Sequence, residues 1–96
     1  MESRQSKLLQ HIVEEYIATA QPVGSSLIVE KYMKDISSPT VRNEMQELER
    51  AGFIRAPHTS AGRIPTEKGY RFYIENILAN KELSARRQET LSEIIK

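Results

Sequence analysis

The sequence predicts a mainly α-helical domain with one small β-hairpin, arranged as a winged helix-turn-helix. Two patterns between residues 37 and 66 lead to this fold class. Residues 38–51 have the apolar spacing of a short helix, and residues 53–65 follow at once with the pattern of a tight basic hairpin. Two helical segments joined by a short turn form the helix-turn-helix itself. The later of these two helices is the one that precedes the hairpin.

The first helix is expected over residues 4–19, where apolar residues recur at i, i+1, i+4 and i+5. Such a wide stripe should face the core and make this helix a scaffold. Its members are Leu8, Leu9, Ile12, Val13, Tyr16, Ile17 and Ala20. Pro22 and Gly24 should then break the helix.

A second helix is expected from Ser25 or Ser26, one of which should cap it, to about Met33. Its inward candidates are Leu27, Ile28 and Tyr32. Free backbone N–H groups at a helix start can also bind a phosphate, so Ser25 and Ser26 are candidate phosphate contacts as well as caps. Residues 34–37 should form the short turn that leads to the third helix.

The third helix has local signals at both ends. Ser38 can cap it, and Pro39 suits the first helical position. Gly52 should end it, because a left-handed residue after a helix costs glycine least. The narrow apolar stripe of this helix consists of Val41, Met45 and Leu48.

The hairpin should pair a strand at residues 53–56 with a return at residues 63–65, around the loop PHTSAG. Thr66 should cap a fourth helix, whose apolar residues are Tyr70, Tyr73, Ile74, Ile77 and Leu78. Residues 80–96 begin with a polar break and could contain a fifth helix from Ser84. We therefore expect a winged helix domain at residues 1–79 and a helical tail or linker at residues 80–96.

Composition restricts the class of protein. The sequence has no cysteine, which excludes disulfides and Cys-based zinc sites and fits a cytoplasmic location. No apolar run approaches the roughly 20 residues of a membrane span, and the N-terminus lacks the pattern of a signal peptide. The glycine spacing matches no nucleotide-binding loop, and the two histidines are far apart in sequence. We therefore expect no enzyme, no metal and no cofactor.

The surface of the third helix opposite its apolar stripe carries groups suited to DNA. At about 100° per residue, this face presents Asn43, Gln46 and Arg50, with Thr40 and Arg42 beside it. Arg, Asn and Gln side chains can recognise base edges in a major groove. We expect Arg42, Asn43 and Gln46 to reach bases. Ser38 and Thr40 should anchor the helix to phosphate, and Arg50 should reach a flanking phosphate.

The hairpin adds a second candidate surface. Its tip, His58, Thr59 and Ser60, together with Arg63, should lie along the DNA backbone or enter the minor groove. Residues 37–73 contain six basic and four acidic residues, a local excess that suits phosphate contact but also an ordinary solvated face. For Arg63, a salt bridge to a carboxylate of the helix is an equally good expectation.

Several motifs resemble the N-terminal domain of the heat-inducible transcription repressor HrcA family. They are Pro22-Val23-Gly24-Ser25, Thr40-Val41-Arg42-Asn43-Glu44-Met45, Leu48-Glu49, Gly52, the long run from Pro57 to Thr66, and Lys68-Gly69-Tyr70-Arg71. The resemblance covers roughly residues 4–78 and rests above all on PHTSAGRIPT, which generic winged helices do not share. The chain departs from the usual family pattern at Ser26, at Pro39 and at residues 33–35.

The resemblance implies a bacterial repressor of chaperone operons in the heat-shock stress response, which binds an inverted-repeat operator in double-stranded DNA as a homodimer. It also implies regulation by the chaperonin. The regions that dimerise the family lie outside this sequence, so we expect an excised domain or a short relative. The main alternative is a winged helix that contacts another protein and not DNA. RNA binding is a weaker alternative, because exposed aromatic residues for base stacking are scarce.

Overall fold

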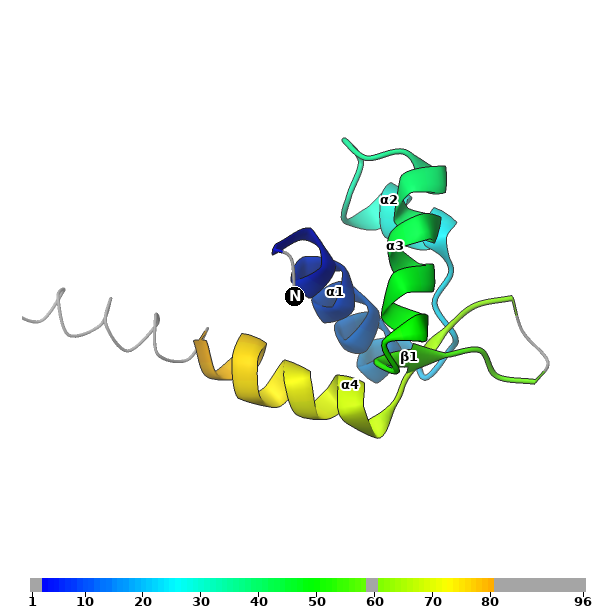
Figure 1. The fold of residues 1–96 in the computed structure, drawn as a ribbon. Coiled ribbons are helices and arrows are strands. Elements are labelled where there is room, and N and C mark those ends of the chain that lie inside the picture. The colour runs from blue at the N-terminus through cyan, green and yellow to red at the C-terminus, as the bar shows by residue number, and fades with distance from the viewer. Residues whose placement is uncertain (1–2, 59–60, 81–96) are drawn as a thin grey trace, which may run out of the picture.

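The computed structural model describes residues 3–58 and 61–80, and its fold is the winged helix-turn-helix that the sequence predicts (Figure 1). The expected fifth helix and the hairpin residues Thr59 and Ser60 lie outside the described residues. The elements in chain order are α1 (Ser3–Thr19), α2 (Ser25–Lys31), α3 (Ser38–Arg50), β1 (Ile54–Arg55), β2 (Ile64–Pro65), α4 (Glu67–Phe72) and the π-helix η1 (Tyr73–Leu78).

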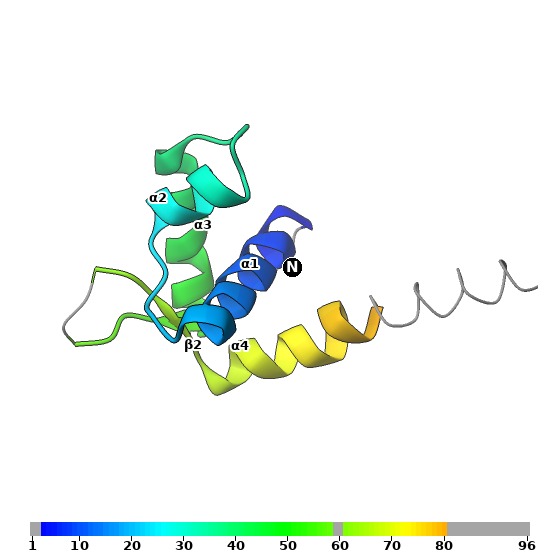
Figure 2. The same cartoon turned by 180° about the vertical axis from the view of Figure 1, so that it is seen from behind.

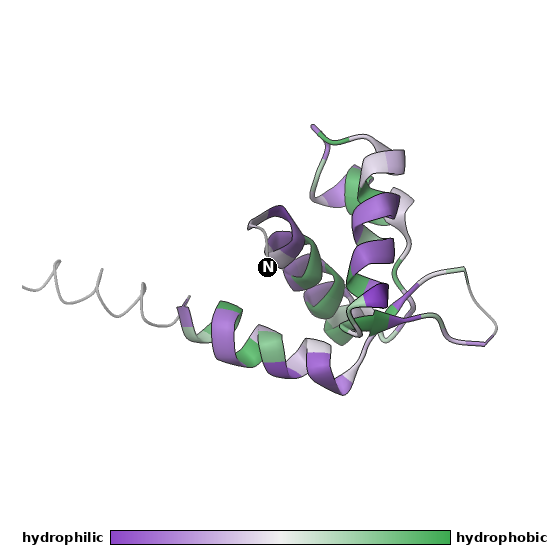
Figure 3. Cartoon of the chain, in the orientation of Figure 1, coloured by the Kyte–Doolittle hydropathy of each residue, from purple (hydrophilic) through white to green (hydrophobic). Residues whose placement is uncertain are grey.

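The core forms around the apolar stripe of α1, as predicted. Leu8, Leu9, Ile12 and Val13 are at most 1% exposed, and they pack with buried residues from the other elements: Val23, Ile28, Val41, Leu48 and Ile54. Figure 3 shows the hydrophobic residues of α1 as green segments of the ribbon. The prediction is wrong for Ile17, which is 63% exposed because the packed elements leave the last turn of α1 uncovered. The central turns of α1 are therefore the scaffold.

The helix-turn-helix is formed by α2 and α3, which pack against each other (Figure 2). The expected caps are wrong at both helices. Gly24 is the N-cap of α2 and offers no side-chain hydrogen bond, so neither Ser25 nor Ser26 caps it. Ser37 caps α3, because its extended backbone turns its hydroxyl to accept from the Thr40 N–H, whereas Ser38 is already helical.

The second helix also ends earlier than the sequence predicts. It stops at Lys31, so that only Ile28 of its expected inward residues is buried. Leu27 is 39% exposed and Tyr32 is 36% exposed. Met33, which follows the helix, is buried although it was not among the expected inward residues.

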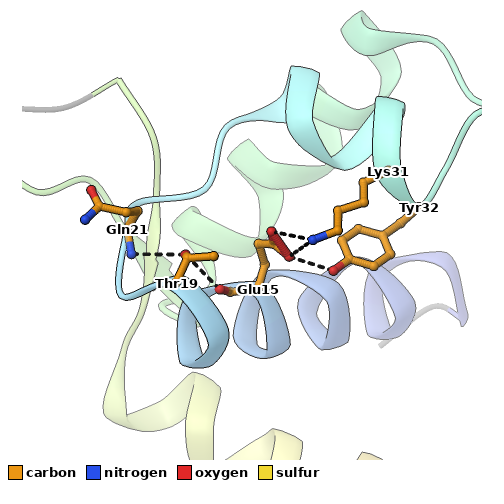
Figure 4. Close-up of polar contacts among 5 residues, drawn as sticks. All are labelled: Glu15, Thr19, Gln21, Lys31 and Tyr32. Atoms are coloured by element: carbon orange, nitrogen blue, oxygen red, sulfur yellow. Dashed lines mark hydrogen bonds and ion pairs between the residues drawn. The ribbon is translucent and has the colours of Figure 1, made fainter.

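A buried carboxylate joins α1 to α2, and no sequence pattern predicted it. Glu15 is only 4% exposed. Its two oxygens accept hydrogen bonds from the Lys31 ammonium at 2.9 and 3.0 Å, and one also accepts from the Tyr32 hydroxyl at 2.6 Å (Figure 4). These bonds from Tyr32 and Lys31 hold the pKa of Glu15 below its usual value of 4.5. The ionised carboxylate therefore helps to fix α2 on α1.

We expect this contact to make the fold sensitive to acid. A carboxyl group whose pKa is lowered by folding contributes stability above its unfolded pKa and loses it as the pH falls through the folded pKa. The thermal midpoint of the domain should therefore fall between pH 7 and values below about 4.5. In Glu15→Gln this fall should be smaller. Glu30→Gln, an exposed position of α2 outside the contact, is the control, and equal pH dependence in all three proteins would contradict the role of Glu15.

The hairpin is shorter than predicted but has a third backbone partner. β1 and β2 are antiparallel and pair Ile54 with Pro65 and Arg55 with Ile64. Arg63 forms an isolated bridge with Val23, in which the two residues exchange N–H···O bonds of 2.8 and 2.9 Å. The segment between α1 and α2 thus holds the base of the hairpin.

The joint between α3 and the hairpin is closed by residues at the start of α4. Gly52 has φ +88°, which confirms the glycine signal at the end of α3. The Thr66 hydroxyl donates to the Gly52 carbonyl, and the Lys68 ammonium donates to the Ala51 carbonyl, both at 2.6 Å. The residues that directly follow α3 are therefore bonded to the start of α4.

The fourth helix begins as predicted, since the Thr66 hydroxyl accepts from the Gly69 N–H at 3.1 Å. It continues as the π-helix η1, which the sequence did not indicate. Tyr73 is buried there and donates its hydroxyl to Glu14 of α1 at 2.8 Å. Burial and this hydrogen bond raise the pKa of Tyr73 to about 12. Ile74, also expected in the apolar stripe, is 56% exposed, so the stripe is only partly covered.

Candidate nucleic-acid interface

The outer face of α3 is available for a partner. Val41, Met45 and Leu48 are buried, which turns Arg42, Asn43 and Gln46 outward. All three side chains are exposed, as the sequence predicted. The ribbon of α3 in Figure 3 accordingly alternates between hydrophobic and hydrophilic residues. This helix can therefore enter a groove without loss of its core contacts.

The start of α3 is partly enclosed. Ser38 and Thr40 are half-buried, and the Thr40 hydroxyl lies 2.8 Å from the Ser37 hydroxyl. Among the candidates in α2, Ser26 is exposed and Ser25 is half-buried. These serine and threonine residues are thus near the surface, with Thr40 already engaged in the cap.

A hollow of about 140 Å³ lies where α3 meets the start of α2 and the base of the hairpin. Its lining residues are Gly24, Ser25, Arg42, Met45, Gln46, Ala61 and Arg63. The fold therefore brings together four candidates that the sequence predicted from three separate segments: Ser25, Arg42, Gln46 and Arg63. Two of these four are arginines, and such a pair favours anionic groups.

Arg63 forms the salt bridge that was one of its two expected roles. Its Nε donates to Glu49 of α3 at 2.8 Å, and its Nη1 donates to the carbonyls of Ala61 and Gly62 at 2.9 and 3.1 Å. The sequence did not indicate which carboxylate of the helix would be the partner of Arg63. The position of Glu49 seven residues after Arg42 puts both residues on one side of α3. This spacing was the signal in the sequence that could have placed Glu49 on the same surface as Arg42.

On the rest of this surface, some arginine side chains form ion pairs and others do not. Arg50 is exposed and pairs with Glu47 at 2.7 Å within α3. Within residues 3–58 and 61–80, the ion pairs include neither Arg42 nor Arg55, both of which are exposed. His58 in the hairpin loop is also exposed. Arg42 and Arg55 therefore offer positive charge that no carboxylate of the described chain neutralises.

The described residues contain no candidate metal-binding group and no candidate membrane-spanning helix. They contain no group of three or more His, Cys, Asp or Glu residues that could hold a metal ion. None of the helices that the structure describes is both long enough and apolar enough to cross a bilayer.

Comparison with known proteins relates this chain to heat-inducible transcription repressors. No family model matches the chain. The heat-inducible transcription repressor HrcA of Pelotomaculum thermopropionicum is 50% identical over 91 residues, which are 95% of this chain and 26% of the relative. HrcA of Acetivibrio thermocellus is 48% identical over 84 residues, or 88% of this chain and 24% of the relative. This chain is homologous to a segment of HrcA. It spans about a quarter of the length of these HrcA relatives.

A solved structure supports the fold. The crystal structure of a protein described as hypothetical, at 2.2 Å resolution, is 51% identical to the chain with a TM-score of 0.77. The match covers 82% of this chain and 25% of that one. The HrcA relatives carry the name of transcription repressors, which are not enzymes, and this agrees with the expectation that the chain is not an enzyme.

Proposed function

We propose that this chain is the sequence-specific DNA-binding domain of a heat-shock transcription repressor. The observation that carries the proposal is the exposed polar face of α3, on which Arg42 lines the hollow and takes part in none of the ion pairs among the described residues. The homology to HrcA supports the same function. An α-helix fits the major groove of B-DNA, where Arg, Asn and Gln can make bidentate contacts with bases.

In this proposal α3 is the recognition helix. Arg42, Asn43 and Gln46 contact base edges, because they are exposed on one side of the helix. Ser38 and Thr40 lie at its start and Arg50 at its end, and these three contact phosphates. Ser25 and Ser26 in α2, with His58, Thr59 and Ser60 in the hairpin loop, contact the backbone of the duplex.

The complete repressor should bind as a homodimer. A single module of this kind covers roughly 600–1,000 Å² of protein surface on DNA, so one half-site binds weakly. Two copies on an inverted repeat would supply the affinity of a repressor. The same proposal includes a cytoplasmic protein, chaperone operons as its targets and the chaperonin as its regulator, all of which follow from the family resemblance.

Binding to a duplex with the inverted repeat associated with the family tests this function. We expect the domain to bind it more tightly than a scrambled duplex of equal composition, with an affinity that falls as salt increases. Fluorescence anisotropy at several salt concentrations measures both quantities. Equal, salt-independent affinities for the two duplexes would reject DNA recognition and favour the alternative of a protein-binding winged helix.

A further inference from the structure

Arg63 connects three parts of the fold at the base of the hairpin. Its backbone pairs with Val23 in the segment between α1 and α2. Its guanidinium bonds to Glu49 of α3 and to the carbonyls of Ala61 and Gly62 in its own loop. The Arg63 side chain is 26% exposed and the Glu49 side chain is 35% exposed. The contact is thus partly shielded from solvent, unlike the ion pair of Arg71 with Glu67, whose side chains are 63% and 87% exposed.

The surroundings of Arg63 leave the base of the hairpin little freedom. Gly62 is buried, and a Cβ at this position would lie 2.9 Å from the Pro22 carbonyl carbon. The strands themselves are only two residues long each, so their own pairing cannot set the angle of the hairpin firmly. The ion pair between Glu49 and Arg63 is a side-chain bond that ties the hairpin directly to α3.

We infer that Glu49, through Arg63, is a positioning residue that sets the hairpin at a fixed angle to the recognition helix. The inference rests on the proposed DNA-binding function and deepens it. The hydrogen bonds described for Arg63 are made within the protein: its side chain donates to Glu49, Ala61 and Gly62, and its backbone pairs with Val23. Arg63 therefore aligns the two DNA-contacting parts, and Arg42 across the hollow is the arginine that meets the nucleic acid.

The substitution Glu49→Gln separates this role from direct phosphate contact by Arg63, because the two roles predict opposite changes. If Arg63 contacts phosphate, loss of the competing carboxylate releases its charge, and affinity for every duplex increases together with the salt slope. If Glu49 positions the hairpin, affinity for the operator duplex falls roughly fivefold or more, although a negative charge has been removed near DNA. Affinity for the scrambled duplex changes little, so the specificity ratio falls.

The experiment compares four proteins on operator and scrambled duplexes: the unchanged chain, Glu49→Gln, Arg63→Gln and the double variant. We expect each single variant to lower the ratio and the double variant to lower it no further than the worse single one, because both remove the same bond. Glu67→Gln is the matched control, since it removes an ion pair of 2.9 Å in α4, outside the proposed interface. Circular dichroism establishes that each variant is folded.

The outcomes are distinct. An unchanged or increased ratio in Glu49→Gln, with the unchanged chain still specific, overturns the positioning role alone. Additive losses in the double variant also overturn it, because the two residues would then act separately. If the unchanged chain does not distinguish the two duplexes, the proposed DNA-binding function itself fails.

Discussion

Gly69→Ala should destabilise the domain by about 1–3 kcal/mol or more, because there is no space for a methyl group at this position. A Cβ there would lie 2.1 Å from the Phe53 carbonyl oxygen, which is backbone and cannot move aside as a flexible side chain can. Either α4 or the segment before β1 must shift. Chemical denaturation of the domain measures the loss, and a decrease of roughly 4–8 °C in the thermal midpoint per kcal/mol should accompany it.

The control for this variant is Gly24→Ala. No atom lies within 4 Å of a Cβ built on Gly24, so the only expected cost is that of a less favoured N-cap residue, about 1 kcal/mol or less. Equal stability of the two variants would show that the close approach of α4 to Phe53 is not a feature of the folded protein in solution.

Asn43→Ala should lower sequence discrimination while leaving most of the non-specific affinity. One bidentate contact between an asparagine and a base is worth about 1–3 kcal/mol of discrimination, whereas non-specific binding comes from phosphate contacts. Asn43 is exposed on α3 and lies on the face away from the buried Val41 and Leu48. Competition between operator and scrambled duplexes measures the ratio, which should fall by roughly tenfold or more.

Asn76→Ala provides the same change of side chain at another exposed helical position. Asn76 lies in η1, for which we propose no DNA contact, so its ratio should equal that of the unchanged chain. Retention of the full ratio in Asn43→Ala would remove this residue from base recognition. A parallel loss in both variants would indicate a general effect on folding.

The sequence predicted those parts of the fold that depend on local signals. The apolar spacing of Leu8, Leu9 and Ile12 indicated α1, and Gly52 and Thr66 correctly indicated the end of α3 and the start of α4. Such signals act within a few residues, where backbone geometry and side-chain period determine structure. The exposed face of α3 followed from the same periodicity.

Features that depend on contacts between distant segments were not predictable in this way. Glu15 meets Lys31 and Tyr32 across two helices, and nothing in their spacing indicates the approach. The bond from Tyr73 to Glu14 joins residues 59 positions apart. The predictions of the helix caps were wrong for a different reason. Adjacent serines at 37–38 can each serve, and the backbone conformation of the turn, which tertiary packing determines, selects Ser37.

The bonds from Thr66 and Lys68 to the carbonyls of Gly52 and Ala51 have a mechanical consequence. They hold α4 in a fixed position relative to the end of α3, because each bond is short and joins the two segments directly. A rotation of α4 is therefore expected to rotate the C-terminal end of α3 with it, because the connection between them is rigid. Under the proposed function, a force on α4 would change the tilt of α3 relative to the bound DNA.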